Sequence, residues 1–428
     1  MKNSAQLRQL LSQQAYNEQI AMLYGCDISD AQPYAMRYLH AMDQLDAEFG
    51  RHETMGLFSA PGRTELGGNH TDHQHGCVLA AAVNIDIIAA VAPNQLGSIR
   101  LLSEGYDVIC VELWDLRKKL EEENTSAAIL RGTCAAYAER GAVLSGLDIY
   151  ISSNVPKGSG VSSSAAFEVL LGTIFNSLFM PQPLSPIEVA KIGQWVENIY
   201  FGKPCGLMDQ MASSVGGVVA IDFADPLHPI VQKVELNLSE AGLSLCIIDS
   251  GADHADLTDE YAAVPNDCKA VASICGAEVL RDVSYDVFLQ NIAECRQKLG
   301  DRATLRAFHF FAENARVSQQ VLALCHKEYD IFLELVNVSG HSSFEYLQNV
   351  IPAGATSQQA VAMTIAIAKD ALNGKGAVRV HGGGFAGTVQ AFVPQERILL
   401  FQQRVEAILG KGSCNVMLIR PVGGYRLA

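Results

Sequence analysis

The chain has 428 residues, of which 49% are hydrophobic, and a formal net charge of −15 at pH 7. This length exceeds the size at which one hydrophobic core keeps growing, so more than one domain is expected. The acidic balance, without a basic patch, argues against binding to nucleic acid. The 11 cysteines form no C-x-x-C pair. Their odd number and the lack of an apolar signal segment predict a cytoplasmic protein with reduced thiols.

The first fifty residues are predicted to be helical. Apolar residues recur there at spacings of three and four, in segments 5–14 and 32–49. We expect this N-terminal extension, residues 1–50, to pack against the rest of the molecule. The longest apolar stretch follows at 76–92, where Asn84 and Asp86 interrupt it. It is therefore interpreted as a core strand or helix pair, and no membrane partner is expected.

A dense group of polar side chains lies in residues 60–76, between apolar flanks. Its charged or titratable members are Arg63, Glu65, His70, Asp72, His73 and His75. The histidines and Asp72 are possible metal ligands, although no H-E-x-x-H or cysteine-rich partner accompanies them. The alternative is a site for a hydroxyl-rich ligand, in which Asn69 and Asp72 bind neighbouring hydroxyls. Arg63 would face a phosphate or a catalytic carboxylate, unless it forms a surface ion pair.

The segment 155–166 predicts a phosphate-binding turn. It follows a strand expected at 147–151 and begins a helix expected to end near Phe179. Its small residues allow close approach of the backbone, and its serines place hydroxyls and free N–H groups at a helix start, which favours an anion. The segment matches neither a Walker A loop nor a Rossmann turn, so a serine-capped helix without a ligand is the alternative.

Two further segments contribute a carboxylate and a glycine-rich turn. Asp209 lies between apolar residues beside a glycine-proline turn, as a helix N-cap or a working group. Glu197 belongs to a helix expected at 187–199 and could reach a magnesium ion held also by a serine of the phosphate loop. The segment 381–388 is glycine-rich between two predicted strands, which lets the backbone close over a ligand.

In this order and at these separations, the four segments resemble the motifs of the GHMP small-molecule kinases, and in particular of the galactokinases. The similar stretches are 61–72 for the sugar motif, 158–165 for the phosphate loop, 204–210 for the base-bearing motif and 382–387 for the closing glycine motif. Weaker likeness continues through 259–261, 309–316 and 339–342, so the resemblance extends from about residue 45 to the end.

The resemblance implies a two-domain α+β fold of the GHMP kinase type. An N-terminal α/β domain, residues 51–228, would carry the phosphate-binding loop. A C-terminal ferredoxin-like α+β sandwich, residues 229–428, would form the second domain, and the site would lie in the cleft between the two domains.

The resemblance also implies ATP-dependent phosphorylation of the anomeric hydroxyl of galactose. Asp209 would orient or deprotonate that hydroxyl, and Arg63 would steady Asp209 and the transferred phosphoryl group. Ser164 and Glu197 would hold Mg²⁺. ATP would be bound by Ser103, Gly158, Ser159, Gly160, Val161, Ser162, Ser163 and Ser164. The sugar would be lined by Asn69, His70, Thr71, Asp72, Gly206 and Tyr261.

Departures from the family pattern leave the substrate open. Asn69 stands where galactokinases usually have a glutamate near the C6 hydroxyl of the sugar, so a C6 carboxylate would no longer be repelled. Asp72 and the following His-Gln also resemble plant galacturonate kinases, and the usual V-S-C-P-E-L-D segment is absent near 348–359. A galacturonate 1-kinase is therefore an alternative, as is a sugar and ATP sensor without turnover. The polar cluster argues against mevalonate or homoserine, and a monomer is favoured.

Overall fold

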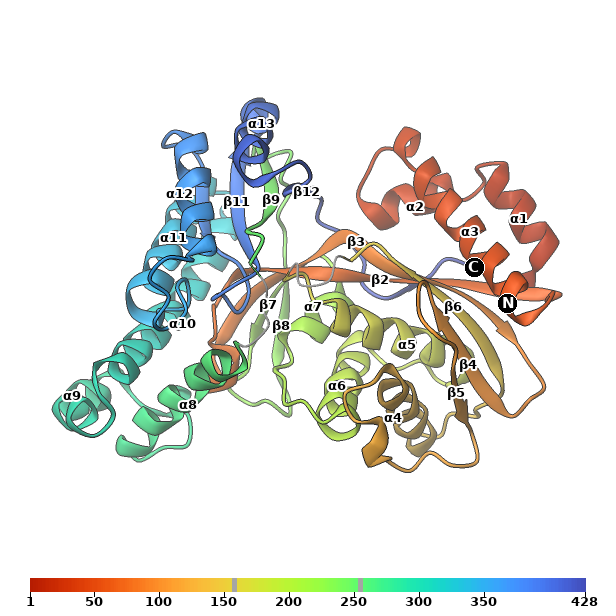
Figure 1. Ribbon diagram of the computed structural model, residues 1–428, viewed down its shortest axis with the longest axis horizontal. Coiled ribbons are helices and arrows are strands. Elements are labelled where there is room, and N and C mark those ends of the chain that lie inside the picture. Colours follow the sequence, from red (N-terminus) through yellow and green to blue (C-terminus); the bar gives the residue numbers. More distant parts are fainter. Residues whose placement is uncertain (156–159, 253–256) are drawn as a thin grey trace.

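Two long antiparallel strands, β2 (Thr54–Gly67) and β3 (Cys77–Pro93), run across the molecule and connect its two halves (Figure 1). The computed structural model describes residues 1–155, 160–252 and 257–428. The apolar stretch at 76–92, for which a core strand or a helix pair was expected, corresponds to the single strand β3. Along β3, Ala89 and Ala90 belong to different hydrophobic cores. Burial on both faces explains why this stretch is apolar without alternation.

The larger sheet is built around these two strands. Its order is β1-β2-β3-β6-β4-β5, with β13 paired to β2 and β7 placed between β3 and β8. Neighbouring strands are antiparallel except β4 and β6. The remaining bounds are β1 Lys2–Asn3, β4 Ser98–Ser103, β5 Ile109–Glu112, β6 Leu147–Ser153, β7 Val218–Asp222, β8 Ile230–Val234 and β13 Tyr425–Arg426.

One face of the larger sheet is covered by helices α4 (Ser126–Glu139), α5 (Ser163–Phe179), α6 (Pro186–Val196) and α7 (Met208–Val215) (Figure 1). The helix predicted from the serine-rich segment is confirmed as α5, and it ends at the predicted residue. The helix predicted at 187–199 corresponds to α6, which is followed by a π-helical turn, Glu197–Phe201.

The opposite face of the sheet is covered by the first fifty residues, as helices α1 (Ser4–Ser12), α2 (Asn17–Tyr24) and α3 (Gln32–Phe49) (Figure 1). A buried carboxylate joins these helices to β3. Asp86 accepts hydrogen bonds from Arg37 Nη1 at 2.6 Å and from the Tyr24 hydroxyl, and Arg420 near the C-terminus lies 3.2 Å away. Asp86, which interrupts the apolar stretch, thus attaches the N-terminal helices to β3. A buried carboxylate requires such partners.

The smaller sheet has the order β10-β11-β9-β12 and is antiparallel throughout. Its strands are β9 Leu243–Asp249, β10 Ala377–Val380, β11 Thr388–Pro394 and β12 Cys414–Met417, and the helices of this half are α8 Thr258–Ile274, α9 Tyr285–Leu299, α10 Asp301–Cys325, α11 Tyr329–Ser342, α12 Ala360–Leu372 and α13 Ile398–Leu409. A second π-helical turn, Ser343–Leu347, follows α11. The predicted α+β fold class is confirmed.

The predicted domain boundaries at residues 50 and 228 stay a prediction. The larger sheet includes β8 after the second boundary and receives the C-terminal strand β13. Across the described residues, no helix has both the length and the apolar character needed to cross a bilayer.

Candidate active site

A bidentate ion pair between Arg63 and Asp209 lies at the centre of the candidate site. Arg63 Nε and Nη2 donate to the two carboxylate oxygens of Asp209 at 2.6 and 2.7 Å. Arg63 comes from β2, and Asp209 lies in the first turn of α7, where the helix dipole favours a negative charge. Burial alone would raise the pKa of Asp209, but the charge and hydrogen bonds of Arg63 hold it below its usual value. The carboxylate is therefore ionised at neutral pH.

The described part of the predicted phosphate loop, residues 160–164, is hydrogen-bonded to this pair. The Arg63 N–H donates to the Val161 carbonyl at 3.1 Å, and Arg63 Nη1 donates to the Gly160 carbonyl. Ser162 adopts a positive φ of 57° and its hydroxyl donates to Asp209 at 2.6 Å. A Cβ at Gly160 would lie 2.7 Å from the Thr388 hydroxyl, so the loop also packs closely on the smaller sheet. Gly158 and Ser159 lie outside the described residues.

A cavity of ≈ 820 Å³ opens beside the N-terminal end of α5. Its lining includes the predicted nucleotide residues Ser103, Ser163 and Ser164, and the predicted metal ligand Glu197. Apolar side chains such as Ile87 complete the wall. A mostly apolar hollow with a few convergent polar groups is typical of a small-molecule site.

The predicted sugar-binding residues meet the closing glycine segment. His70 Nε2 lies 2.8 Å from the Gly383 carbonyl, and the Tyr261 hydroxyl donates to the Gly384 carbonyl at 2.7 Å. Asp72 lies against the loop before α7, because a Cβ at Gly206 would stand 2.1 Å from Asp72 Oδ2. Segments far apart in the chain are thus brought together, and Gly206 precedes Asp209 by three residues.

The Thr71 side chain stabilises the conformation of this loop. Its hydroxyl lies within hydrogen-bonding distance of the Gly68 and Cys77 carbonyls, at 2.9 and 2.6 Å. The His70 and His73 rings stand 6.4 Å apart, and the described part of the chain contains no group of three or more His, Cys, Asp or Glu side chains placed to hold a metal ion.

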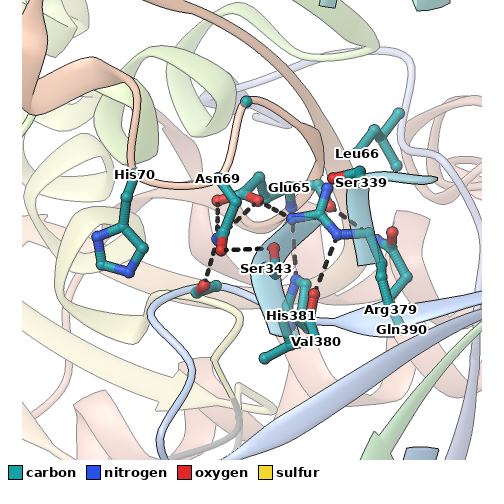
Figure 2. A network of polar contacts seen from close by, with 12 residues as sticks. Glu65, Leu66, Asn69, His70, Ser339, Ser343, Arg379, Val380, His381 and Gln390 are labelled. Atoms are coloured by element: carbon teal, nitrogen blue, oxygen red, sulfur yellow. Dashed lines mark hydrogen bonds and ion pairs between the residues drawn. The ribbon is translucent and has the colours of Figure 1, made fainter. Parts of the chain in front are cut away.

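Asn69 belongs to a buried polar network that sequence reasoning did not foresee (Figure 2). Its Nδ2 donates to the Gly382 carbonyl at 2.6 Å and lies 3.1 Å from Glu65 Oε1. Its Oδ1 accepts from Asn349 at 2.8 Å and from Ser343 at 3.3 Å. Both ends of the amide are therefore occupied by protein groups.

Glu65 pairs with the fully buried Arg379 of β10 in the same network (Figure 2). Burial raises the pKa of Glu65 to about 7, although Arg379 and Arg63 act in the opposite direction. Figure 2 shows the His70 ring turned away from this pair. The polar side chains of the segment 60–76 thus fall into two groups. Glu65 and Asn69 connect β2 and the turn after it to the smaller sheet and its glycine segment. His70 and Asp72 lie in the candidate sugar site.

Two more carboxylates, Glu168 and Glu197, line the cavity described above. The Gln210 side-chain amide donates to Glu168 at 2.9 Å and to Glu197 at 3.0 Å. Burial, followed by the nearby charge of Glu197, raises the pKa of Glu168 well above its usual value. Glu168 was not among the predicted site residues, because it appears in the sequence as a single polar position on an apolar helix.

Models of two protein families match the chain. The model of the GHMP kinases N terminal domain matches residues 127–217, and the galactokinase galactose-binding signature matches residues 44–93. A galactokinase from Glaesserella parasuis is 30% identical over 357 residues, or 83% of this chain and 89% of that protein. A galactokinase from Streptomyces coelicolor is 32% identical over 379 residues, or 87% of this chain and 94% of that protein.

Solved structures share the fold. The galactokinase of Lactococcus lactis, crystallised with galactose, superposes with a TM-score of 0.77 at 23% identity, covering 91% of this chain and 99% of that one. The mevalonate kinase of Methanococcus jannaschii superposes with a TM-score of 0.62 at 14% identity, covering 86% and 99%. The kinase fold implied by the sequence motifs is confirmed.

These matches define a small-molecule kinase of the GHMP class. Within that class, the chain belongs to the galactokinase family, because galactokinases at 30% and 32% identity align with it over most of their lengths.

Proposed function

We propose that the protein transfers the γ-phosphoryl group of ATP to the anomeric hydroxyl of galactose, giving galactose 1-phosphate and ADP. The observation that carries this proposal is the ion pair between Arg63 and Asp209, which is bonded directly to the phosphate loop. A base fixed at the end of a phosphate cradle suits in-line phosphoryl transfer to a hydroxyl, which depends mainly on alignment and charge neutralisation.

Asp209 accepts the hydrogen bond, and then the proton, of the C1 hydroxyl. The sugar oxygen forms a bond to the γ-phosphorus while the bond from that phosphorus to the bridging oxygen breaks, and ADP leaves with the electron pair. Arg63 keeps Asp209 ionised and ready to accept. Ser162, which donates to the same carboxylate, holds its orientation against the loop.

The nucleotide is assigned to the cavity at the start of α5. Residues 158–164 would bind the phosphates through backbone N–H groups and hydroxyls at the helix N-terminus. Ser103 lies on the cavity wall, and in this proposal it would contact the nucleoside. Ser164 and Glu197 line the same cavity and offer the oxygen ligands that Mg²⁺ prefers. A divalent cation held there would neutralise phosphate charge during transfer.

The sugar is assigned to His70, Asp72, Gly206 and Tyr261, while the buried Thr71, predicted as a sugar contact, would hold the loop that carries His70 and Asp72. Asn69 would act indirectly, because its hydrogen bond to the Gly382 carbonyl holds the turn that carries His70 in place. Recognition of a C6 carboxylate requires free donors, and both hydrogens of the Asn69 amide already have acceptors in Gly382 and Glu65. This arrangement, together with the galactokinase relatives, favours galactose over galacturonate.

The substrate assignment is tested by ADP release in the presence of ATP and magnesium, with galactose, galacturonate, glucose and mevalonate as acceptors. Galactose should give the highest kcat/KM, and Asp209→Asn should remove the activity. Turnover confined to galacturonate would contradict the choice of sugar. Sugar and ATP binding without turnover would contradict catalysis and support a sensor. A cytoplasmic monomer without nucleic-acid or membrane partners is part of the same proposal, and light scattering tests the monomer.

A further inference from the structure

Glu168 lies on the face of α5 that borders the nucleotide cavity. It follows Ser164 by four residues, so the two side chains lie one helical turn apart on the same side of α5. Both line the cavity, as does Glu197 from the π-helical turn after α6. Only 3% of the surface of Glu168 is exposed. A carboxylate at this depth needs a partner, because burying a bare charge is costly.

The described residues provide too little positive charge for the two carboxylates. Lys203 is the cation paired with Glu197, at 4.0 Å, and its side chain is 64% exposed. Among the described residues, Glu168 has no ion pair, and its Oε1 is buried without a hydrogen-bond partner. Its other oxygen accepts from the Gln210 amide, which also donates to Glu197. The Gln210 amide therefore holds two carboxylates side by side, and among the described residues Oε1 of Glu168 receives no hydrogen-bond donor.

We propose that Glu168 is a second carboxylate ligand of the divalent cation that accompanies the nucleotide, beside Ser164 and Glu197. The proposal rests on the nucleotide-site assignment made above. Mg²⁺ in kinase sites is typically held by one or two carboxylates together with substrate phosphates. The free oxygen of Glu168 supplies a ligand, and the cation supplies the positive charge that the buried pair of carboxylates lacks. Because phosphates complete the coordination, the cation binds tightly only with nucleotide present.

Gln210 acts as a positioning residue for this pair. It follows Asp209 directly on α7, so one helical turn carries both the group that receives the proton and the amide that orients the two carboxylates. A shift of α7 would therefore displace the base and the metal ligands together. Sugar and metal sites are coupled through this turn without a direct contact between them.

The test measures Mn²⁺ binding to the full chain by electron paramagnetic resonance, with ADP and without sugar, so that no turnover is involved. Glu168→Gln removes the charge but keeps the size of the side chain and an oxygen that accepts from Gln210. It should weaken Mn²⁺ binding by about tenfold or more, as loss of a group in a metal site typically does. The exposed Glu139 of α4 provides the matched control, and Glu139→Gln should bind Mn²⁺ as the wild type does.

Thermal unfolding separates loss of a ligand from loss of structure. Without metal, Glu168→Gln should melt no lower than the wild type, because it replaces an unpaired buried carboxylate with a neutral amide. If that variant does not fold, Glu168→Asp should show the same weakened Mn²⁺ binding, because it withdraws the carboxylate by one methylene group.

Mn²⁺ affinity of Glu168→Gln within twofold of the wild type would overturn the proposal while leaving the nucleotide site intact. A wild-type protein that binds no Mn²⁺ with ADP would overturn both this proposal and the magnesium assignment. Because the titration contains no sugar, its outcome is independent of whether galactose is the acceptor.

Discussion

Replacement of Asp209 by asparagine tests the centre of the site, because it exchanges one carboxylate oxygen for an NH2 group and keeps the size of the side chain. The amide would turn a nitrogen toward Arg63 or Ser162, both of which donate to this position. Arg63 is 7% exposed and would lose its counter-charge. Breaking a fully buried pair costs about 3–5 kcal/mol. Because the Asp209 side chain is 29% exposed, a loss of about 2 kcal/mol in the free energy of unfolding is expected after allowance for solvent.

The effect on catalysis should be larger than the effect on stability. Loss of a proton acceptor lowers kcat by about 10²–10⁴-fold, while the affinity for ATP should change little. The assay combines steady-state ADP release, calorimetric titration with a non-hydrolysable ATP analogue and urea unfolding. Folded Asp209→Asn protein with kcat within threefold of wild type would refute the role of Asp209.

The pH dependence gives an independent check on the same carboxylate. Its folded pKa is held below the usual 3.8, so the stability from the ion pair is present at neutral pH and is lost as the pH falls through the folded value. The decrease in the free energy of unfolding at acidic pH should therefore be smaller in Asp209→Asn than in the wild type.

Further substitutions address the rest of the site. Arg63→Lys should lower kcat by about tenfold or more, because an ammonium cannot form the two parallel bonds to the carboxylate; steady-state kinetics measures it. Burial raises the pKa of Glu65 from 4.5 to about 7, so the folded chain keeps a proton that the unfolded chain has lost. The free energy of unfolding should therefore fall as the pH rises through that window, and urea unfolding should show less of this slope in Glu65→Gln. Asn69→Glu should lower the melting temperature by placing a second carboxylate against Glu65, and combining it with Glu65→Gln should restore part of the loss; unchanged melting of Asn69→Glu would contradict the contact. Arg37→Ala should destabilise the chain by about 1–3 kcal/mol, because Asp86 loses one of its partners in the buried core; equal urea midpoints for variant and wild type would show that the N-terminal helices do not depend on this pair.

Helices and strands could be predicted where the residues that determine them are close together in the sequence. The serines at 162–164 and the apolar spacing after them predicted α5, and the two strands around the glycine-rich segment 381–388 were found as β10 and β11. The helix α2 was missed because it has only 8 residues, too few for periodicity to identify.

Contacts between distant segments could not be predicted in the same way. Glu65 and Arg379 are 314 residues apart, and nothing in either stretch indicates that the two side chains meet. The segment 60–76 lies within the stretch matched by the galactokinase galactose-binding signature, but the sequence alone does not show which of its side chains are buried. Asn69 was interpreted as a sugar contact, and the structure adds that its amide is already occupied by protein partners.

The most direct measurement is nuclear magnetic resonance of the product formed from galactose, ATP and magnesium. The account predicts one sugar phosphate whose anomeric proton is split by phosphorus, formed by the wild type and absent with Asp209→Asn. Phosphate attached at C6, or equal product formation by the variant, would contradict transfer to the anomeric hydroxyl by the base at Asp209.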